Sequence, residues 1–257
     1  MLVSANGRRV SRAFGTDLVW DGFKNYCYRF MILTGKFCVS EPLFWSMEMS
    51  KTRVLDHPLV DCHLTNLRKK QTQPAEFRAS IAELSKILAY FASSDLPTTA
   101  TTIETPIQDM RGSVVSGRVG LIPIMRAGIS MVQPVLGLIP QAEVWHLGLY
   151  RDEQTALPVH YYSKLPPSAP VEVALILDPM LATGGSAALA CQQMQDWGVS
   201  KIKLLSIIAA PEGIQKVNAE FPDVEIHACV VDQQLNEDNF IVPGLGDAGD
   251  RIFNTLH

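Results

Sequence analysis

The sequence predicts an α/β protein, built on a parallel β-sheet with helices on both faces. Apolar, strand-like runs alternate along the chain with helical segments, an order that is typical of parallel sheets. The runs are apolar almost throughout, as expected for strands that are buried on both sides. With 257 residues, 47% of them hydrophobic and 19% charged, the chain has the composition of an ordinary globular protein.

The expected elements follow in order along the chain. Helices are expected at 74–93, 129–138, 186–197 and 212–221, and strands at 119–124, 144–149, 173–177, 202–208 and 224–231. In the first helix, the apolar residues Phe77, Ile81, Leu84, Leu88 and Phe91 recur at helical spacing, and Pro74 suits the first turn. Ligands of such sheets bind at the carboxyl ends of the strands, so residues after 124, 149, 177 and 231 are the first candidates for a site.

Charge and cysteine content exclude several classes of protein. The net charge of −4 provides no basic field for nucleic-acid binding. The five cysteines are odd in number and lack C-x-x-C spacing, which argues against a zinc site or a disulfide framework and favours the cytoplasm. The six histidines show no metal-ligand spacing, and the apolar runs are too short to cross a membrane.

The first 48 residues differ from the rest. They hold six Lys/Arg against four Asp/Glu, a net +2, and the remainder of the chain is therefore at −6. They show no helical or strand period, and their early arginines resemble an organelle transit peptide only faintly. We expect residues 1–48 to be an appendage or the product of a start codon assigned too far upstream. Residues 49–257 are then the functional domain.

The segment from Leu175 to Ser186 has the features of a phosphate site. A buried strand ends at Asp178, and Thr183, Gly184, Gly185 and Ser186 follow at the start of a helix. Glycines allow the backbone to approach an anion closely, and a helix N-terminus offers unpaired N–H groups. The loop lacks the lysine of a P-loop and the pattern of a dinucleotide fold. A capped helix with a glycine turn and no ligand is the alternative.

This loop resembles the phosphoribosyl pyrophosphate (PRPP) loop of the uracil phosphoribosyltransferases. Segments 123–128, 148–153, 161–166, 209–213 and 241–251 also resemble signatures of that family, in the same order, so the resemblance covers about residues 53–257. Departures are small. Met125 replaces the usual leucine, segment 232–237 lacks the usual glycine, and segment 90–96 varies the common pattern.

The resemblance implies a phosphoribosyltransferase fold with a β-rich flexible hood and a C-terminal uracil-binding hood. It implies the conversion of uracil and PRPP to UMP and diphosphate, with Asp178, Arg126 and Asp247 as catalytic residues. The implied PRPP-binding residues are Arg126, Arg151, Asp178, Pro179, Met180, Leu181, Ala182, Thr183, Gly184, Gly185, Ser186 and Asp247. The implied uracil-binding residues are Ile241, Gly246, Asp247 and Ala248.

The same resemblance implies Mg²⁺ held mainly by PRPP and water, without a direct protein ligand. It also implies a homo-oligomer and a possible activation by GTP. The basic run Arg68–Lys70 is interpreted as a solvated face, with a nucleotide effector contact as the alternative. Two rival functions are an RNA-binding regulator on a related fold, which the negative charge disfavours, and an inactive relative. The latter is expected to lack Asp178, the glycines or an arginine, and this chain keeps them.

Overall fold

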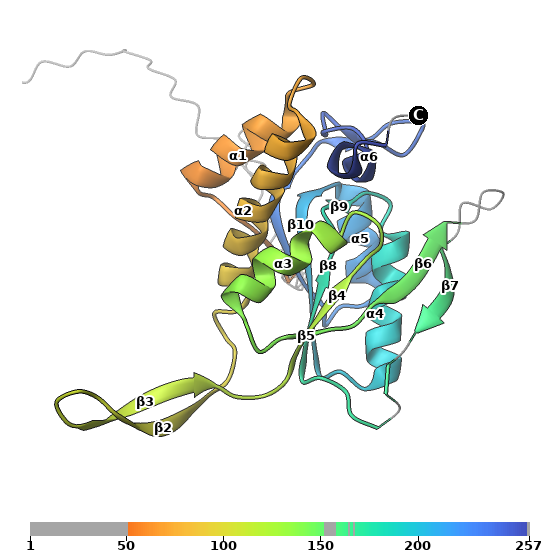
Figure 1. Ribbon diagram of the computed structural model, residues 1–257. Coiled ribbons are helices and arrows are strands. Elements are labelled where there is room, and N and C mark those ends of the chain that lie inside the picture. Colours follow the sequence, from red (N-terminus) through yellow and green to blue (C-terminus); the bar gives the residue numbers. More distant parts are fainter. Residues whose placement is uncertain (1–50, 152–157, 164, 167, 256–257) are drawn as a thin grey trace, which may run out of the picture. The chain divides into compact units, whose positions relative to one another are not determined.

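The computed structural model describes residues 51–255 except 152–157, 164 and 167, and between residues 148 and 163 it describes the backbone alone. The predicted extension at 1–48 lies outside the described residues. A central sheet of parallel strands runs through the domain (Figure 1). Its strands are, in spatial order, β1 (Thr52–Val54), β11 (Glu225–Val231), β10 (Lys201–Ala209), β8 (Val173–Leu177), β4 (Val119–Pro123) and β5 (Glu143–Val144), and β9 (Met180–Leu181) also pairs with β10.

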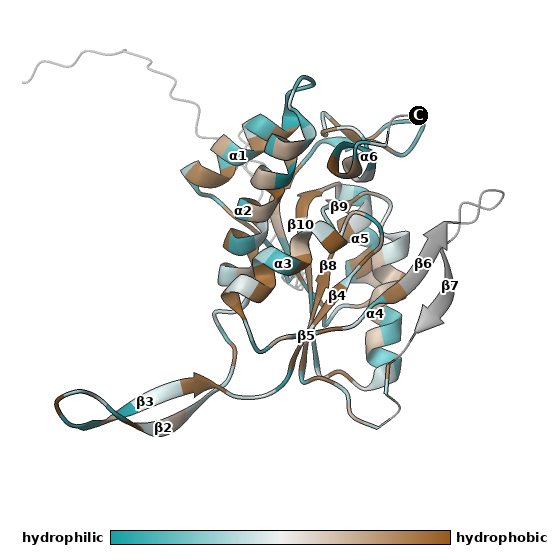
Figure 2. Ribbon diagram, viewed as in Figure 1, coloured by the Kyte–Doolittle hydropathy of each residue, from teal (hydrophilic) through white to brown (hydrophobic). Residues whose placement is uncertain are grey.

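Helices cover both faces of this sheet, as predicted. One face is covered by α2 (Pro74–Ala92) and α3 (Ile129–Leu138), with α1 (Pro58–Arg68) and α6 (Ala248–Phe253) beside them. The other face is covered by α4 (Gly185–Trp197) and α5 (Pro211–Glu220). Successive side chains of a strand point to opposite faces, so Leu175 joins the first apolar cluster and Ile176 the second. The strands are brown along their length in Figure 2 because both faces are buried.

The α2 helix confirms most of its predicted buried face and corrects one residue. Phe77, Ile81, Leu84 and Leu88 are fully buried, whereas Phe91 is 41% exposed. Ala92 takes the buried position instead, because at 3.6 residues per turn both i+3 and i+4 fall near the same face. Phe91 packs edge-on against Tyr90 at the surface.

The predicted strand at 144–149 is two separate strands. The sheet strand β5 ends at Val144, and β6 (Leu147–Arg151) begins a hairpin with β7 (Pro158–Ser163). A single bridge between Ile124 and Leu147 joins the base of this hairpin to the end of β4. The predicted β-rich hood corresponds to this hairpin. Residues 152–157, which connect β6 to β7, lie outside the described ranges.

A second hairpin was not predicted from the sequence. It consists of β2 (Thr98–Glu104) and β3 (Asp109–Val115), and it extends away from the sheet in Figure 1. The side chains on both strands are almost all exposed. A third, very short hairpin pairs β12 (Gln234–Leu235) with β13 (Ile241–Val242) near the C-terminus. No helix within the described part of the chain is long and apolar enough to cross a lipid bilayer.

Candidate functional site

Three segments meet at the carboxyl edge of the sheet, where the sequence predicted a site. The first follows β4 at 124–128, the second follows β8 at 178–186, and the third is the C-terminal segment from β13 into α6 (Figure 1). Hydrogen bonds and close contacts connect the first segment to the end of β8 and to α6. Parallel strands carry their carboxyl ends to one edge, which explains why segments so distant in sequence come together.

Asp178 lies at the end of β8, partly buried at the edge of a pocket. The pocket is lined by residues 178 and 180–187, which run from the end of β8 through β9 into the first turn of α4. The backbone N–H of Asp178 donates to the Leu205 carbonyl at 3.1 Å, and its Oδ1 accepts from the Met180 N–H at 3.2 Å. Burial raises the pKa of Asp178 to about 7, and the Met180 hydrogen bond opposes that shift. The carboxyl group can therefore change its charge near neutral pH.

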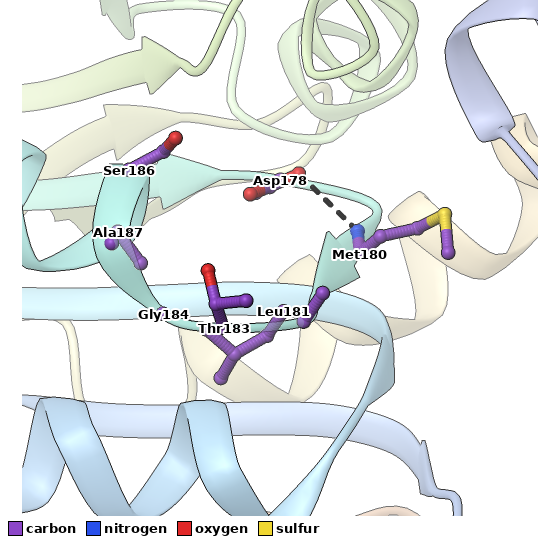
Figure 3. A pocket seen from close by; sticks show the side chains of 9 residues that line it. Asp178, Met180, Leu181, Thr183, Gly184, Ser186 and Ala187 are labelled. Atoms are coloured by element: carbon purple, nitrogen blue, oxygen red, sulfur yellow. Dashed lines mark hydrogen bonds between the residues drawn. The ribbon is translucent and has the colours of Figure 1, made fainter. Parts of the chain in front are cut away.

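The loop after Asp178 curls around the N-terminus of α4. Gly184 precedes the helix with a φ of 77°, a left-handed conformation that favours glycine. In Figure 3 the Asp178 carboxylate and the hydroxyls of Thr183 and Ser186 lie around the same hollow. Carboxylate, hydroxyls and the first N–H groups of a helix are here gathered in one place, an arrangement suited to an anionic, hydroxyl-bearing ligand.

The start of α5 packs closely against this loop, which accounts for the Ala209–Gly213 motif. A side chain at Gly213 would collide with the Ala182 carbonyl, and one at Gly184 would lie 2.9 Å from the Gly213 carbonyl oxygen. The Ala210 N–H donates to the Leu181 carbonyl at 2.8 Å. The motif therefore packs against the loop at residues 181–184 and holds its backbone in place, a role that was not predicted from the sequence.

Arg126 lies in the loop after β4, next to the end of β8. The Ile124 N–H donates to the Leu177 carbonyl at 2.9 Å, and a side chain at Gly128 would collide with that same carbonyl. The Arg126 side chain is half exposed, and its Nη2 contacts Asp250 Oδ1 in α6 at 3.0 Å. Its guanidinium thus connects the loop after β4 with the C-terminal helix, a contact that the sequence did not predict.

The predicted uracil-binding residues form a compact C-terminal segment. Ile241 in β13 and Ala248 in α6 are buried, and Gly246 has a left-handed φ of 79°. Asp247 is the N-cap of α6, where its Oδ1 accepts from the Asp250 N–H at 2.8 Å. Asp247 and Gly249 approach Arg126, since a side chain at Gly249 would lie 3.2 Å from Asp247 Oδ1 and 3.5 Å from Arg126 Nη2.

The structure therefore groups most of the predicted site residues. Arg126, the loop from Asp178 to Ser186 and the segment from Ile241 to Ala248 lie at one edge of the sheet. Arg151 is the last residue of β6, which belongs to the hairpin and not to the central sheet. Its side chain lies outside the described part of the molecule. Within the described residues, no group of three or more His, Cys, Asp or Glu side chains could hold a metal ion.

Comparison with known proteins gives a consistent result. The family described as uracil phosphoribosyltransferase matches residues 54–255. The uracil phosphoribosyltransferase of a Roseiflexus species is 53% identical over 207 residues, which are 80% of this chain and 100% of the relative. That of Thermus thermophilus is 48% identical over 203 residues, which are 79% of this chain and 98% of the relative.

A solved structure from Aquifex aeolicus has a similar fold. It superposes with a TM-score of 0.74 at 35% sequence identity, covering 79% of this chain and 97% of the other.

Proposed function

The chain belongs to the uracil phosphoribosyltransferase family, and we propose that it carries out the reaction of that family at the carboxyl edge of its sheet. In this reaction uracil and PRPP give UMP and diphosphate. The observation that carries the proposal is the loop from Asp178 to Ser186, which combines a partly buried carboxylate with the N-terminus of a helix. PRPP presents both partners that such a loop suits, namely ribose hydroxyls and a 5′-phosphate.

Asp178 is proposed to accept hydrogen bonds from the ribose hydroxyls. As diphosphate departs, positive charge develops at the anomeric carbon, and a fixed carboxylate stabilises that charge. Burial raises the pKa of this group to about 7, so it stays protonated in acid and becomes ionised when the pH rises above neutral. Residues 179–186 are proposed to bind the 5′-phosphate, and this holds the ribose in position for attack.

Arg126 and Arg151 are proposed to bind the diphosphate. A guanidinium group offers a planar pair of donors that matches phosphate oxygens. Arg126 pairs with Asp250, so bound diphosphate would replace one anionic partner by another. Mg²⁺, held mainly by PRPP and water, would neutralise part of the charge on the leaving group.

The C-terminal segment is proposed to bind uracil through its backbone. Ile241, Gly246, Asp247 and Ala248 would offer N–H and C=O groups to the edge of the base, and Asp247 would also lie near PRPP. Cytosine exchanges the donor and acceptor positions of that edge and leaves buried groups unpaired, a mismatch that discriminates by about 10⁴-fold. The N1 atom of uracil forms a bond to the anomeric carbon and loses its proton to the departing diphosphate or to solvent, and the bond from that carbon to the diphosphate oxygen breaks.

The deciding experiment is UMP formation from radiolabelled uracil and PRPP, with cytosine and orotate as alternative bases. Product is expected with uracil alone. Equal turnover of orotate would contradict the assigned base, and the absence of any product would contradict the enzyme assignment.

The β2–β3 hairpin supports a homo-oligomer. An isolated two-stranded hairpin is marginally stable in water, and this one exposes apolar side chains at Ile103, Ile107, Met110 and Val114. Covering these side chains with a second copy would remove them from water. Replacing Ile107 and Met110 by serine should lower the mass found by sedimentation equilibrium, and an unchanged mass would contradict this interface.

Three further proposals rest on family membership. We propose a cytoplasmic enzyme, activation by GTP, and a catalytic domain at 49–257 to which residues 1–48 are an appendage. The family match beginning at residue 54 supports this boundary. Activity measured over a wide range of GTP concentrations tests the second, and an unchanged rate would contradict it without affecting the enzyme assignment.

A further inference from the structure

Arg68 connects the end of α1 to the C-terminal segment of the chain. Its guanidinium makes a bidentate ion pair with Asp232, at the end of β11, with distances of 2.9 Å from Nη1 to Oδ2 and 2.6 Å from Nη2 to Oδ1. Nη1 also donates to the Gly244 carbonyl at 2.9 Å. Asp232 accepts in turn from the Gly244 N–H at 2.9 Å. Both backbone groups of Gly244 are therefore held by one ion pair.

The pair is well placed to act as a rigid support. The Asp232 side chain is 4% exposed and the Arg68 side chain 27%, so water competes little for their hydrogen bonds. Gly244 has a left-handed φ of 61°, and a side chain there would collide with the Ile241 carbonyl. The backbone at this point thus has a fixed and unusual path.

A second arginine, Arg251, connects the C-terminal segment back to the end of α1. Arg251 in α6 donates to the Leu245 carbonyl at 2.7 Å and to the carbonyls of Leu67 and Lys69, at 2.5 and 2.7 Å, at the end of α1. Its guanidinium lies over the Phe77 ring at 4.3 Å. The turn at Gly244 and Leu245 is consequently attached to α1 on both sides, by one arginine from α1 and one from α6.

We propose that the Arg68–Asp232 pair positions the uracil-binding backbone and so sets the affinity for the base. The inference rests on the proposed function, because it needs Ile241 and residues 246–248 to bind uracil. Gly244 lies between these two groups of residues, three after Ile241 and two before Gly246. Arg68 and Asp232 are positioning residues that act through the backbone and need not touch the substrate.

Loss of the pair should lower the affinity for uracil selectively. Without it the loop occupies its binding conformation for a smaller fraction of the time, and the apparent affinity falls by that fraction. We expect Arg68→Gln to raise the KM for uracil about tenfold or more, because charge-assisted hydrogen bonds to a buried carboxylate are lost. The KM for PRPP should change less than the KM for uracil, since its proposed phosphate loop belongs to β8 and α4 and only Asp247 of the C-terminal segment is proposed to lie near PRPP. The value of kcat at saturating uracil should be nearly unchanged.

The chain offers a matched control. Arg118 makes an equivalent bidentate ion pair with Glu143, with distances of 2.6 and 2.9 Å, and also donates to the Ala169 carbonyl at 3.0 Å. This pair joins the start of β4 to β5, at the opposite ends of these strands from the site. Arg118→Gln removes a comparable set of contacts and should reduce stability while leaving the KM for uracil unchanged.

The experiment compares Arg68→Gln, Arg68→Lys and Asp232→Asn with Arg118→Gln in the full chain. Steady-state kinetics in both substrates is combined with hydrogen exchange of the backbone amides at 244–246. We expect faster exchange and a raised uracil KM in the Arg68 and Asp232 variants alone, with Arg68→Lys the mildest because it keeps the charge. Similar kinetic changes in Arg118→Gln, or an unchanged uracil KM in Arg68→Gln, would overturn the proposal. If the unmodified chain forms no UMP, the proposed function fails instead.

Discussion

Asp178 is a residue at which one substitution should change stability and activity in opposite directions. Its carboxyl group is partly buried, and the hydrogen bond that the structure gives it comes from the Met180 N–H at 3.2 Å. Burial favours the neutral form and raises the pKa of Asp178 from 3.8 to about 7. Asp178→Asn keeps the shape of the side chain and one acceptor oxygen, and removes the charge.

The size of the effect on stability follows from the shift in pKa. A rise from 3.8 to about 7 is roughly 3 units, which corresponds to at most about 4 kcal/mol of unfavourable interaction of the ionised form. Between these two values the folded protein binds more protons than the unfolded chain, so stability falls as the pH rises. Above the folded pKa the full penalty applies. At about pH 5 most of it is absent, because the folded protein keeps the carboxyl group protonated.

Urea unfolding of Asp178→Asn and the unmodified chain at about pH 5 and about pH 8 measures this difference. We expect the variant to gain about 2–3 kcal/mol relative to the unmodified chain on going from about pH 5 to about pH 8, because part of the penalty already applies at pH 5. In the activity assay the same variant should lose about 10²-fold or more in kcat, the usual effect of removing one preorganised electrostatic contact. Stability and activity thus report on the same charge.

Asp223→Asn provides the control, because Asp223 is exposed and its pKa is lowered by its ion pair with Lys51. This variant should show no alkaline gain in stability and no loss of activity. If Asp178→Asn gains no stability at high pH, the carboxyl group is not electrostatically penalised. If its kcat is near normal, Asp178 only organises the loop through Met180.

Three other predictions follow from the site. Arg126→Ala should raise the KM for PRPP and lower kcat, each about tenfold or more, because it removes a contact present before and during the reaction; steady-state kinetics with an unchanged KM would contradict this. Gly213→Ala should cost about 1–3 kcal/mol in urea unfolding and weaken PRPP binding, because the added methyl collides with the Ala182 carbonyl. Its control, Gly137→Ala, meets nothing within 4 Å and should be neutral or stabilising. A chain that starts at Met49 should fold and form UMP like the full chain, and loss of activity in the same assay would show that residues 1–48 are needed.

Helices and strands whose buried apolar residues follow a regular pattern could be predicted from the sequence. The strand at 173–177 and the helix at 129–138 have the bounds that the structure gives to β8 and α3. Buried strands lose polar residues on both faces, so the apolar run itself marks the element. The loop after β8 was also predictable, because a strand-end acid followed by glycines and hydroxyls has few structural uses.

The β2–β3 hairpin could not be predicted in the same way. Its strands have neither a buried face nor an apolar alternation, since six of the seven side chains in each strand are exposed. Periodicity reports burial within one chain, and a segment that packs against nothing in that chain gives no such signal. The prediction of one strand at 144–149 failed for a related reason, because two short strands separated by Trp145 and His146 have the same composition as one longer strand.

The Arg68–Asp232 ion pair could not be predicted for a different reason. It depends on which residues meet in the fold, and periodicity does not report that. Arg68 belongs to a basic run that was interpreted as a solvated face, and Lys69 and Lys70 are indeed exposed. Arg68 differs because Asp232, 164 residues later, reaches it from the end of β11. A charge is buried only when its partner is present, and the sequence around Arg68 does not contain that partner. Strand-end acids such as Asp178 and Asp232 are recognisable in the sequence, but the fold decides which of them pairs with an arginine.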